Sequence, residues 1–485
     1  MKEELQSLRD HDTWDIVPLS ELKGRKPIGC KWVFKLKLNS DGSVERYKAR
    51  LVAKGFTQME GLDFFETFAP TLSYAAFRIL VCDAAVNDLE IEALDVKTAF
   101  LNGVMDAVVF MKLPPGVDPT LERGGVHGPA CCRLKKALYG TKQASHLWHA
   151  SIDGTLVQLG FRACISEPCV YVKRTRSGER IKIGLFVDDL IPTFKEKDRA
   201  EWNEIKSALC STYDMKDLGP AEWVLAMKIT RDRSRRSIEL TQESYIEKLL
   251  QQFGMDQSKP QETPELQAKL SRADEATLEQ RAEMQQRPYM ELVGSLLYAS
   301  ISTRPDIAHA VAMLCRAMQN PGPAHWIAAK KVLRFLAGTP NKGIRFSASD
   351  ALPSQPSNNT CSIEVYCDAD WAGDVDDRRS TSGCVILLNG CAVIWLSKKQ
   401  ATVALSTAEA EYMAMSAALK EVKWLVQLLE EMGCTVEKPV PIYSDNQAAI
   451  SISSASAVPQ SRTKHIDLRH HYVRESVRNG DIAIR

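Results

Sequence analysis

The sequence has no long apolar run and no apolar N-terminal stretch. A membrane-spanning helix needs about 20 mostly apolar residues, and no apolar run of even about 18 occurs in this chain of 485 residues. The N-terminus, MKEELQSLRD, is charged where a signal peptide has its apolar core. We therefore expect a protein that does not enter a membrane.

The 13 cysteines include no C-x-x-C pair. The close pairs Cys131/Cys132 and Cys164/Cys169 have no His or Cys partners at the spacing of a zinc site. Scattered thiols of this kind are typical of reduced, mostly buried cysteines in an intracellular protein. We expect neither a disulfide framework nor a structural zinc ion.

An excess of charge of one sign is also missing, because 62 Lys and Arg face 61 acidic residues. Between residues 23 and 54, however, ten Lys or Arg stand against two acids. This stretch alternates apolar and polar residues around a turn at 39–43, which predicts a long β-hairpin over 28–54. Its interleaved Trp32, Phe34 and Tyr47 fit a groove for a phosphate backbone, and a solvated hairpin face is the alternative.

Composition divides the chain. At about 150 residues per domain, 485 residues indicate roughly three domains. The polar stretch 256–287 marks a first boundary, residues 288–346 have helical spacing with a stop at Gly338 and Pro340, and 347–360 have the composition of a linker. A new unit of strands and helices follows.

A first set of carboxylates lies at predicted strand ends. Asp95 follows an apolar strand in IEALDVKTAFLNG, and Asp188 and Asp189 occupy the tip of a hairpin in IKIGLFVDDLI. Carboxylates on adjacent strands repel one another unless divalent cations neutralise them, and two Mg²⁺ ions serve in-line phosphoryl transfer. The set therefore suggests a two-metal site, although the Asp-Asp dipeptide alone favours a simple polar turn.

A second set lies near the C-terminus. Asp368 ends a strand in EVYCDADW, and Asp445 does the same in PIYSDNQAAI. The segment between them predicts an amphipathic helix that ends at Gly433. Its apolar residues, three and four apart, are Tyr412, Met415, Leu419, Val422, Val426 and Leu429.

Two glutamates open this helix, and they have different interpretations. Ser406 and Glu409 fit an S-x-x-E capping box, which gives Glu409 a structural task. Glu411 has no such task and is the third candidate carboxylate of a second metal site. The neighbouring acids Asp370, Asp374, Asp376 and Asp377 are expected to form a solvated loop.

A series of motifs resembles, in order and spacing, the reverse transcriptase and RNase H region of copia-type LTR retrotransposon Pol polyproteins. The resemblance covers nearly the whole chain. The motifs are GCKWVFKLK, DGSVERYKARLVAKGFTQ, FAPT, LDVKTAFLNG, LKKALYGTKQAS, LFVDDLI, YCDADWAGDVDDRRSTSG, STAEAEYMA, SDNQAAI and TKHIDLRHHYVRE.

The resemblance implies a multidomain protein of the α+β and α/β classes. A right-hand polymerase would comprise fingers and palm with an antiparallel sheet (1–255) and a largely helical thumb or connection (256–346). After the linker (347–360), an RNase H-like domain with a mixed sheet would occupy 361–485. Such a protein copies RNA into DNA by attack of the primer 3′-hydroxyl on a nucleotide α-phosphate, and hydrolyses the RNA of the resulting hybrid.

The resemblance also implies roles for the first set. Asp95, Asp188 and Asp189 would be catalytic metal ligands for two Mg²⁺ or Mn²⁺ ions, and Lys48 and Arg50 would hold the nucleotide triphosphate.

Two further residues of this half receive roles from the resemblance. Phe100 would be the aromatic gate that excludes a 2′-hydroxyl, with a core phenylalanine as the alternative. Gln143 would line the template and nucleotide pocket.

In the second half, the resemblance makes Asp368, Glu411 and Asp445 the ligands of two further ions. Asp467 would be a fourth catalytic carboxylate, with helix capping as its alternative role and Glu475 as a less favoured substitute. His465 would help the product leave.

The implied partners are an RNA template, a DNA primer, the RNA–DNA hybrid and deoxynucleoside triphosphates. The chain contains no zinc-knuckle, aspartic-protease or integrase motif and lacks the usual tail of the family after Arg485. We therefore expect the C-terminal portion of a polyprotein, shortened at its end. It would be intracellular, in cytoplasmic virus-like particles or in the nucleus.

Some positions depart from the family pattern. Pro192 stands in a predicted central strand, where proline cannot donate to the ladder. The others are Phe186 in place of Tyr, and Thr141, Ser145 and His146 in LYGTKQASHLWH. They support the alternative of a degenerate or host-retained copy that binds nucleic acid without polymerising.

Overall fold

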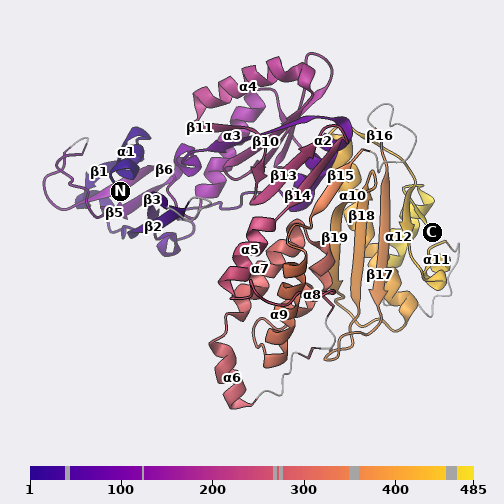
Figure 1. Ribbon diagram of the computed structural model, residues 1–485. Helices are drawn as coiled ribbons and strands as arrows, with labels where there is room; N and C mark the ends of the chain where they lie inside the picture. The colour runs from indigo at the N-terminus through magenta and orange to yellow at the C-terminus, as the bar shows by residue number, and fades with distance from the viewer. Residues whose placement is uncertain (39–43, 123–124, 266–269, 272–276, 349–359, 455–466) are drawn as a thin grey trace. The chain divides into compact units, whose positions relative to one another are not determined.

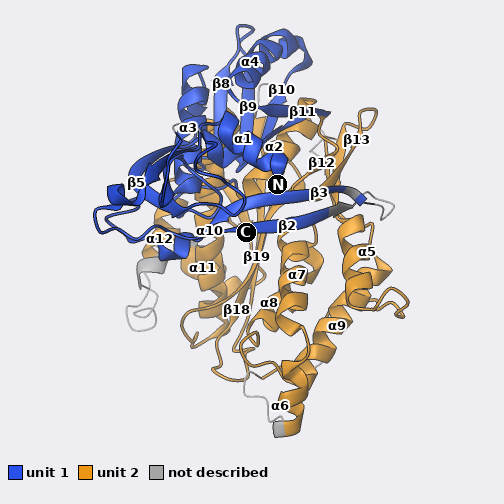
Figure 2. Cartoon of the chain, turned by 90° about the vertical axis from the view of Figure 1, so that its left-hand side faces the viewer, with its two compact units in different colours: residues 1–72, 92–219 blue, residues 73–91, 220–485 orange. Residues whose placement is uncertain are grey.

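The computed structural model describes residues 1–38, 44–122, 125–265, 270–271, 277–348, 360–454 and 467–485 (Figure 1). They form two compact units, coloured separately in Figure 2: unit 1 holds 1–72 and 92–219, and unit 2 holds 73–91 and 220–485. These borders differ from the predicted domain borders, which remain predictions. Most of the predicted linker, 349–359, lies outside the described residues.

The predicted fold class is confirmed, because the chain is a multidomain α and β protein with several sheets. Among the described residues, no helix combines the length and the apolar character that crossing a membrane requires.

Unit 1 is built around a six-stranded sheet. In spatial order its strands are β11 (Met215–Pro220), β4 (Glu90–Val96), β10 (Asp189–Phe194), β9 (Arg180–Phe186), β8 (Val170–Arg174) and β7 (Arg162–Ala163). The predicted hairpin is confirmed, because β9 and β10 pair antiparallel with only Val187 and Asp188 between them. The turn lies beside the end of β4, where Val96 N–H donates to the Asp188 carbonyl (2.8 Å).

Helices α3 (Ala144–Gln158) and α4 (Arg199–Thr212) lie beside this sheet (Figure 1). In α4, the buried Trp202 stacks on Phe194 of β10 (5.7 Å between ring centroids) and donates to Glu92 of β4 (2.8 Å). Burial raises the pKa of Glu92, but hydrogen bonds from Lys206, Trp202 and Arg199 outweigh it and lower the pKa overall. The helix is therefore fastened to the strand that leads to Asp95.

Pro192 is compatible with the hairpin in which it lies. The register places it opposite Ile183, three pairs beyond the pair that closes the turn, Asp189 and Phe186. In an antiparallel ladder, hydrogen-bonded pairs alternate with non-bonded ones, starting from a bonded pair at a two-residue turn. Pro192 therefore falls on a non-bonded pair, and its missing N–H removes no bond between β9 and β10.

A smaller layer of unit 1 consists of helix α1 and a three-stranded sheet. The elements are α1 (Lys2–Asp10), β1 (Trp14–Pro18), β6 (Ala130–Lys136) and β5 (Val104–Lys112), with the short 3-10 helices η1 (Leu19–Leu22), η2 (Gly55–Thr57), η3 (Ala99–Asn102) and η4 (Glu196–Asp198) elsewhere in the unit. Leu8, Ile16, Leu51, Val109 and Leu134 belong to one buried cluster, which joins helix, sheet and the neighbouring hairpin.

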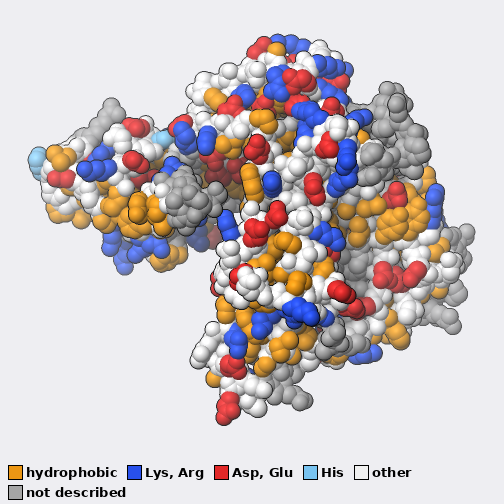
Figure 3. All heavy atoms as spheres, in the orientation of Figure 1, with side chains coloured by type: hydrophobic (Ala, Val, Ile, Leu, Met, Phe, Trp, Pro, Cys, Tyr) orange, Lys and Arg blue, Asp and Glu red, His pale blue; other side chains and the backbone are white. Residues whose placement is uncertain are grey.

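The predicted basic hairpin is confirmed as strands β2 (Cys30–Leu38) and β3 (Val44–Ala53). Because side chains alternate along a strand, the register sorts them by face. One face carries Lys31, Lys35, Arg46, Lys48 and Arg50, and the other carries Trp32, Phe34, Leu36, Tyr47 and Leu51. Phe34 is 67% exposed and Tyr47 82% exposed. In Figure 3, Lys and Arg gather beside hydrophobic side chains on this part of unit 1.

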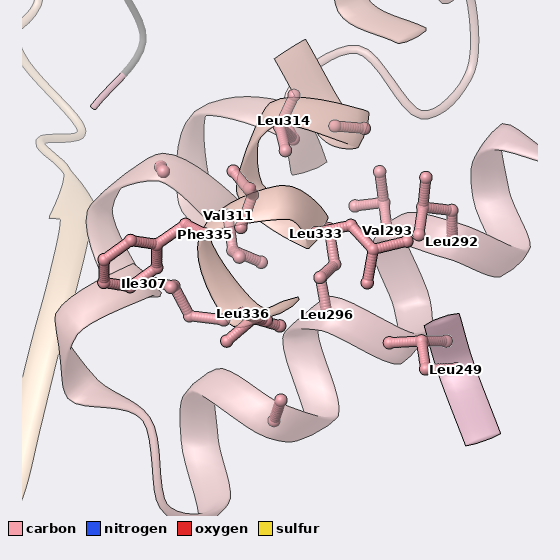
Figure 4. Packing of buried hydrophobic residues seen from close by; sticks show 14 of the residues in the cluster. Leu249, Leu292, Val293, Leu296, Ile307, Val311, Leu314, Leu333, Phe335 and Leu336 are labelled. Carbon is pink, nitrogen blue, oxygen red and sulfur yellow. The ribbon is translucent and has the colours of Figure 1, made fainter. Parts of the chain in front are cut away.

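In unit 2, a bundle of helices encloses a second core, shown in Figure 4. Its elements are α5 (Glu243–Gln252), α6 (Leu278–Gln285), α7 (Tyr289–Ser302), η5 (Pro305–Ile307), α8 (Ala308–Cys315) and α9 (Pro323–Gly338). Leu249, Leu296, Val311, Leu333 and Leu336 are among the buried residues. The predicted helical spacing over this region is thus confirmed as far as Gly338.

Helix α9 ends at Gly338, where its stop is predicted, but the strand that follows was not predicted. Residues 344–347 form strand β15 (Ile344–Ser347), because Ile344 and Phe346 are buried with exposed Arg345 between them, which is a strand period. The strand completes a sheet whose other members, from the opposite edge inward, are β12 (Trp223–Val224), β13 (Met227–Asp232) and β14 (Ser237–Thr241).

The C-terminal part of unit 2 is a mixed five-stranded sheet. Its order is β19 (Cys391–Lys399), β18 (Thr381–Leu388), β17 (Ile363–Asp370), β21 (Val440–Tyr443) and β22 (Ile482–Ile484), and β16 (Thr360–Cys361) pairs separately with β20 (Thr435–Val436). The helices are α10 (Thr407–Glu431), α11 (Gln447–Ser454) and α12 (Asp467–Arg478). Helix α10 packs on β17 and β18. It matches the predicted amphipathic helix, except that Leu425 is buried and Val426 only half-buried.

Helix α2 (Tyr74–Asn87) joins the parts of unit 2 through Arg78, which is 4% exposed. The guanidinium donates to the carbonyls of Val393 (2.7 Å), Ile301 (2.7 Å) and Ser302 (3.2 Å). It also lies 3.8 Å from the ring centroid of Trp395. Burial lowers the pKa of Arg78 to about 9. One side chain thus connects α2, α7 and β19.

Replacement of Arg78 should destabilise unit 2. Lysine cannot reproduce a planar fork that donates to several carbonyls and stacks on an indole. We expect Arg78→Lys to lower the free energy of unfolding by about 3 kcal/mol in urea titrations, because buried carbonyls lose their donors. Arg235→Lys is the control: Arg235 makes a surface pair with Asp232, and its loss should cost about 0.5 kcal/mol or less. Equal losses for the two variants would contradict the role of Arg78.

Candidate active sites

One pocket of unit 1 collects most of the first predicted set. Asp95 at the end of β4 and Asp188 in the hairpin turn line it together with Lys48 and Arg50 of β3. Asp189, the first residue of β10, adjoins Asp188 and faces the charges of both other aspartates. The structure thus brings acidic strand ends and the basic face of the β2–β3 hairpin to one pocket.

Burial and repulsion shape the ionisation of these acids. Burial, followed by the charges of Asp188 and Asp95, raises the pKa of Asp189 to about 6. Burial also raises the pKa of Asp188, and the charge of Asp95 adds to it while Arg50 and Lys48 oppose it. Half-buried carboxylates that resist deprotonation fit a divalent cation, since its charge favours the ionised forms.

A stack of side chains lies beside the acids. Arg50 lies over the ring of Tyr139, 4.5 Å from its centroid, and Phe100 meets Tyr139 edge to face at 5.1 Å. Phe100 is half-buried, so it is neither a core residue nor fully open. The sequence reasoning missed Tyr139, although it stands in the LYG string next to the turn glycine Gly140.

Gln143 does not line this pocket. Its side chain is fully buried, accepts a hydrogen bond from Gln58 (3.0 Å) and donates to the carbonyl of Asp63 (2.8 Å) and the carboxylate of Asp106 (3.3 Å). The predicted contact of Gln143 with template or nucleotide stays a prediction. In this structure its amide ties three distant segments of unit 1 together.

The turn before Gln143 is tightly packed. Gly140 has φ +88°, and an added Cβ would lie 2.3 Å from the carbonyl oxygen of Ala53. The N–H of Ala53 donates to the carbonyl of Tyr139 (2.7 Å), and the N–H of Gly55 donates to the carbonyl of Gly140 (3.1 Å). Glycine is therefore required where the Tyr139 turn meets the end of β3.

The second predicted set forms a compact cluster in unit 2. Ligand atoms of Asp368 on β17, Glu411 on α10 and Asp445 after β21 all lie within 4.8 Å of one another. Glu411 Oε1 accepts the N–H of Ala369 (3.0 Å), and Glu411 Oε2 is buried without a hydrogen-bond partner among the described residues. Three convergent carboxylates with an unsatisfied buried oxygen fit a hard cation such as Mg²⁺ or Mn²⁺.

The predicted capping box at the start of α10 is half formed, because Glu409 caps the residue before Ser406 instead of Ser406 itself. Ser406 Oγ accepts the N–H of Glu409 (3.2 Å), and the Glu409 carboxylate accepts the N–H of Leu405 (2.8 Å). Burial is the largest cause that raises the pKa of Glu411 to about 7. The neighbouring Asp368 and the charge of Asp445 add to the rise, and the hydrogen bond from the N–H of Ala369 opposes it.

Three other predictions have different outcomes. His465 lies outside the described residues, and Asp467 begins α12 but its side chain is not described. The prediction of a solvated loop was wrong for Asp374. This residue is buried and forms ion pairs with Arg316 (2.9 Å) and Lys399 (2.5 Å). Those cations come from α8's end and β19, so the sequence near Asp374 does not reveal them.

Comparisons with known proteins show the family of the chain. A family model described as reverse transcriptase (RNA-dependent DNA polymerase) matches residues 11–267. The chain belongs to the reverse transcriptase family, and relatives that are 36–42% identical over the full chain are Pol polyproteins of copia-type retrotransposons.

Two relatives illustrate the match. The Pol polyprotein from transposon TNT 1-94 of Nicotiana tabacum is 42% identical over 486 residues, which is 100% of this chain and 35% of that protein. A putative transposon Ty5-1 protein of Saccharomyces cerevisiae is 33% identical over 68% of this chain and 100% of its own length. The chain spans about a third of the length of the longer plant relatives.

Among solved structures, a foamy viral protease-reverse transcriptase in complex with double-stranded DNA aligns with a TM-score of 0.49 and 12% identity. The alignment covers 100% of this chain and 69% of that one.

The raised pKa of Glu411 predicts how stability depends on pH. Between its ordinary value of 4.5 and about 7, the folded metal-free protein keeps a proton that the unfolded chain releases. Stability should therefore fall as pH rises through this window, and Mg²⁺ should restore it at the upper end. Thermal midpoints measured across pH with and without Mg²⁺ test this.

Paired variants isolate the effect from other acids. Glu411→Gln should flatten the pH dependence and remove the response to Mg²⁺, whereas Glu409→Gln on the same helix should retain both. An unchanged pH slope in Glu411→Gln would assign the effect to another group.

Proposed function

We propose that this chain is an RNA-directed DNA polymerase with ribonuclease H activity from a copia-type retrotransposon. The observation that carries the proposal is that acids and bases of distant motifs meet in one pocket, with Asp95, Asp188, Lys48 and Arg50 at its wall. Membership in the reverse transcriptase family supports the polymerase half. The cluster of Asp368, Glu411 and Asp445 supports the nuclease half.

In the polymerase site, Asp95, Asp188 and Asp189 would hold two Mg²⁺ or Mn²⁺ ions, which stabilise negative charge on the transferring phosphate when bound. Lys48 and Arg50 would bind the triphosphate, since fixed cations stabilise a phosphate more strongly in a half-buried pocket than in water. The stack of Arg50 on Tyr139 restrains the guanidinium. Phe100, against the same ring, would border the sugar of the incoming deoxynucleotide.

The two faces of the β2–β3 hairpin suit a single-stranded template. Lys48 and Arg50 of the basic face line the pocket together with Tyr47 of the other face, and the rings of Phe34 and Tyr47 are exposed. Bases stack on exposed aromatic rings regardless of sequence, while cations follow the backbone. We therefore favour a nucleic-acid surface over a merely solvated hairpin.

In the nuclease site, Asp368, Glu411 and Asp445 would hold two ions of the same kind beside an RNA phosphodiester. The N–H of Ala369 keeps Glu411 directed toward the other two acids. Asp467 would supply a fourth carboxylate and His465 would assist product release. A protein with both sites would make RNA–DNA hybrid from template, primer and nucleotides and then remove its RNA, in cytoplasmic particles or the nucleus.

Single substitutions should separate the two activities. Asp188→Asn should reduce primer extension on an RNA template at least about 100-fold and leave cleavage of a preformed hybrid intact. Glu411→Gln should do the reverse. Both activities are to be scored with the same purified chain and Mg²⁺.

Glu409→Gln is the matched control and should retain both activities, because Glu409 serves the helix end. If the wild-type chain binds hybrid but does not extend primers, it is a degenerate copy, and the polymerase half of the proposal is wrong. If Glu411→Gln cleaves normally, the nuclease assignment is wrong.

Nucleotide binding by the hairpin gives a further prediction. Lys48→Gln should raise the KM for deoxynucleotides about ten-fold, because Lys48 lines the pocket. Lys35→Gln is the control, since Lys35 lies directly opposite Lys48 in the ladder but does not line the pocket. Steady-state kinetics at saturating template distinguish the two, and equal KM changes would contradict a specific role for Lys48.

A further inference from the structure

The turn that carries Asp188 contains a strained residue. Val187 has φ +55°, a left-handed conformation. For a β-branched L-residue this conformation is a true outlier, because its Cβ crowds the backbone. A two-residue hairpin calls for positive φ at this first turn position, and a valine there is strained, so a contact that fixes its carbonyl helps the turn to keep this conformation.

Trp148 of helix α3 contacts this residue. Its indole Nε1–H donates to the carbonyl of Val187 at 2.6 Å. Trp148 is only 2% exposed and meets the ring of Tyr213 edge to face at 5.3 Å. The Tyr213 hydroxyl in turn donates to the carbonyl of Ser151 (3.0 Å) and lies 2.7 Å from Thr155 Oγ1. The donor is therefore itself fixed on the helix.

The turn is held from two directions. Trp148 donates a hydrogen bond to the carbonyl of Val187. On the other side, the N–H of Val96, the residue after Asp95, donates to the carbonyl of Asp188 (2.8 Å). The peptide between Val187 and Asp188 is thus oriented by one bond on each side. The direction in which the Asp188 side chain leaves the turn depends on that orientation.

We propose that Trp148 is a positioning residue of nucleotide addition: its indole N–H keeps Val187 in the left-handed conformation that aims Asp188 into the pocket. This inference rests on the proposed polymerase function. It predicts that the N–H, and not the bulk of the ring, carries the effect. It also predicts that the need for the bond disappears when residue 187 accepts positive φ without strain, as glycine does.

The test is a set of four proteins: wild type, Trp148→Phe, Val187→Gly and the double variant. Trp148→Phe keeps an aromatic ring and removes the donor. We expect kcat for primer extension to fall about ten-fold or more while the KM for deoxynucleotide changes less than about two-fold, because misplaced reacting groups slow chemistry more than binding. In the Val187→Gly background, the same change should cost less than about three-fold.

Tyr171→Phe is the matched control. It also keeps an aromatic ring and removes a buried donor of unit 1, the hydroxyl that donates to Asp153 of α3 (2.9 Å), and it should lower the thermal midpoint without this separation of kcat from KM. If Trp148→Phe behaves like Tyr171→Phe, or if Val187→Gly gives no rescue, Trp148 only packs and the inference is overturned.

A second readout is independent of extension. Mn²⁺ titrations are followed by electron paramagnetic resonance. Every protein in them also carries Asp368→Asn and Asp445→Asn, so that the acidic cluster of unit 2 binds no Mn²⁺. Mn²⁺ should bind several-fold more weakly to Trp148→Phe, with recovery in the double variant. If wild type extends no primer, the proposed function fails, and this titration decides the positioning role alone: equal Mn²⁺ affinities would overturn it.

Discussion

Repulsion between acidic side chains is the constraint on which both candidate sites depend. Carboxylates that approach within a few ångströms in a half-buried place raise one another's pKa and destabilise the metal-free fold. The rest of the structure must therefore hold them there. In unit 1, β4 and the β9–β10 turn do so through the Val96 bond to Asp188. In unit 2, two strand ends and a 25-residue helix do so, with Glu411 anchored to Ala369.

The scaffolds that carry these acids are fastened by polar bonds at buried places. Glu92, beside the path to Asp95, receives three donors from α4. Arg78 similarly holds β19 in place. Its partners are carbonyls and an indole ring, and none of them is an acid. Apolar packing alone would tolerate small sliding of helix on sheet, whereas each of these bonds fixes a particular register.

Local periodicity explains what could be predicted from the sequence. The β2–β3 and β9–β10 hairpins and helix α10 follow from alternation or from three-and-four spacing, and the acidic clusters follow from strand ends. Gln143 and Asp374 could not be placed in this way. Their partners, among them Asp63 and Lys399, lie far away in sequence, and a polar side chain looks solvated until such partners are known. The grouping of α2 with unit 2 likewise depends on long-range contacts, with β14, β15 and β19.

The sorting of the β2–β3 hairpin by face has a consequence for how this segment can change in length. Its cations lie on one side and its rings on the other only because side chains alternate with a period of two. Insertion of one residue within either arm would exchange the faces beyond that point and place aromatic rings where the cations now lie. Insertion of two residues would preserve them. Length variation in the arms should therefore occur in even steps.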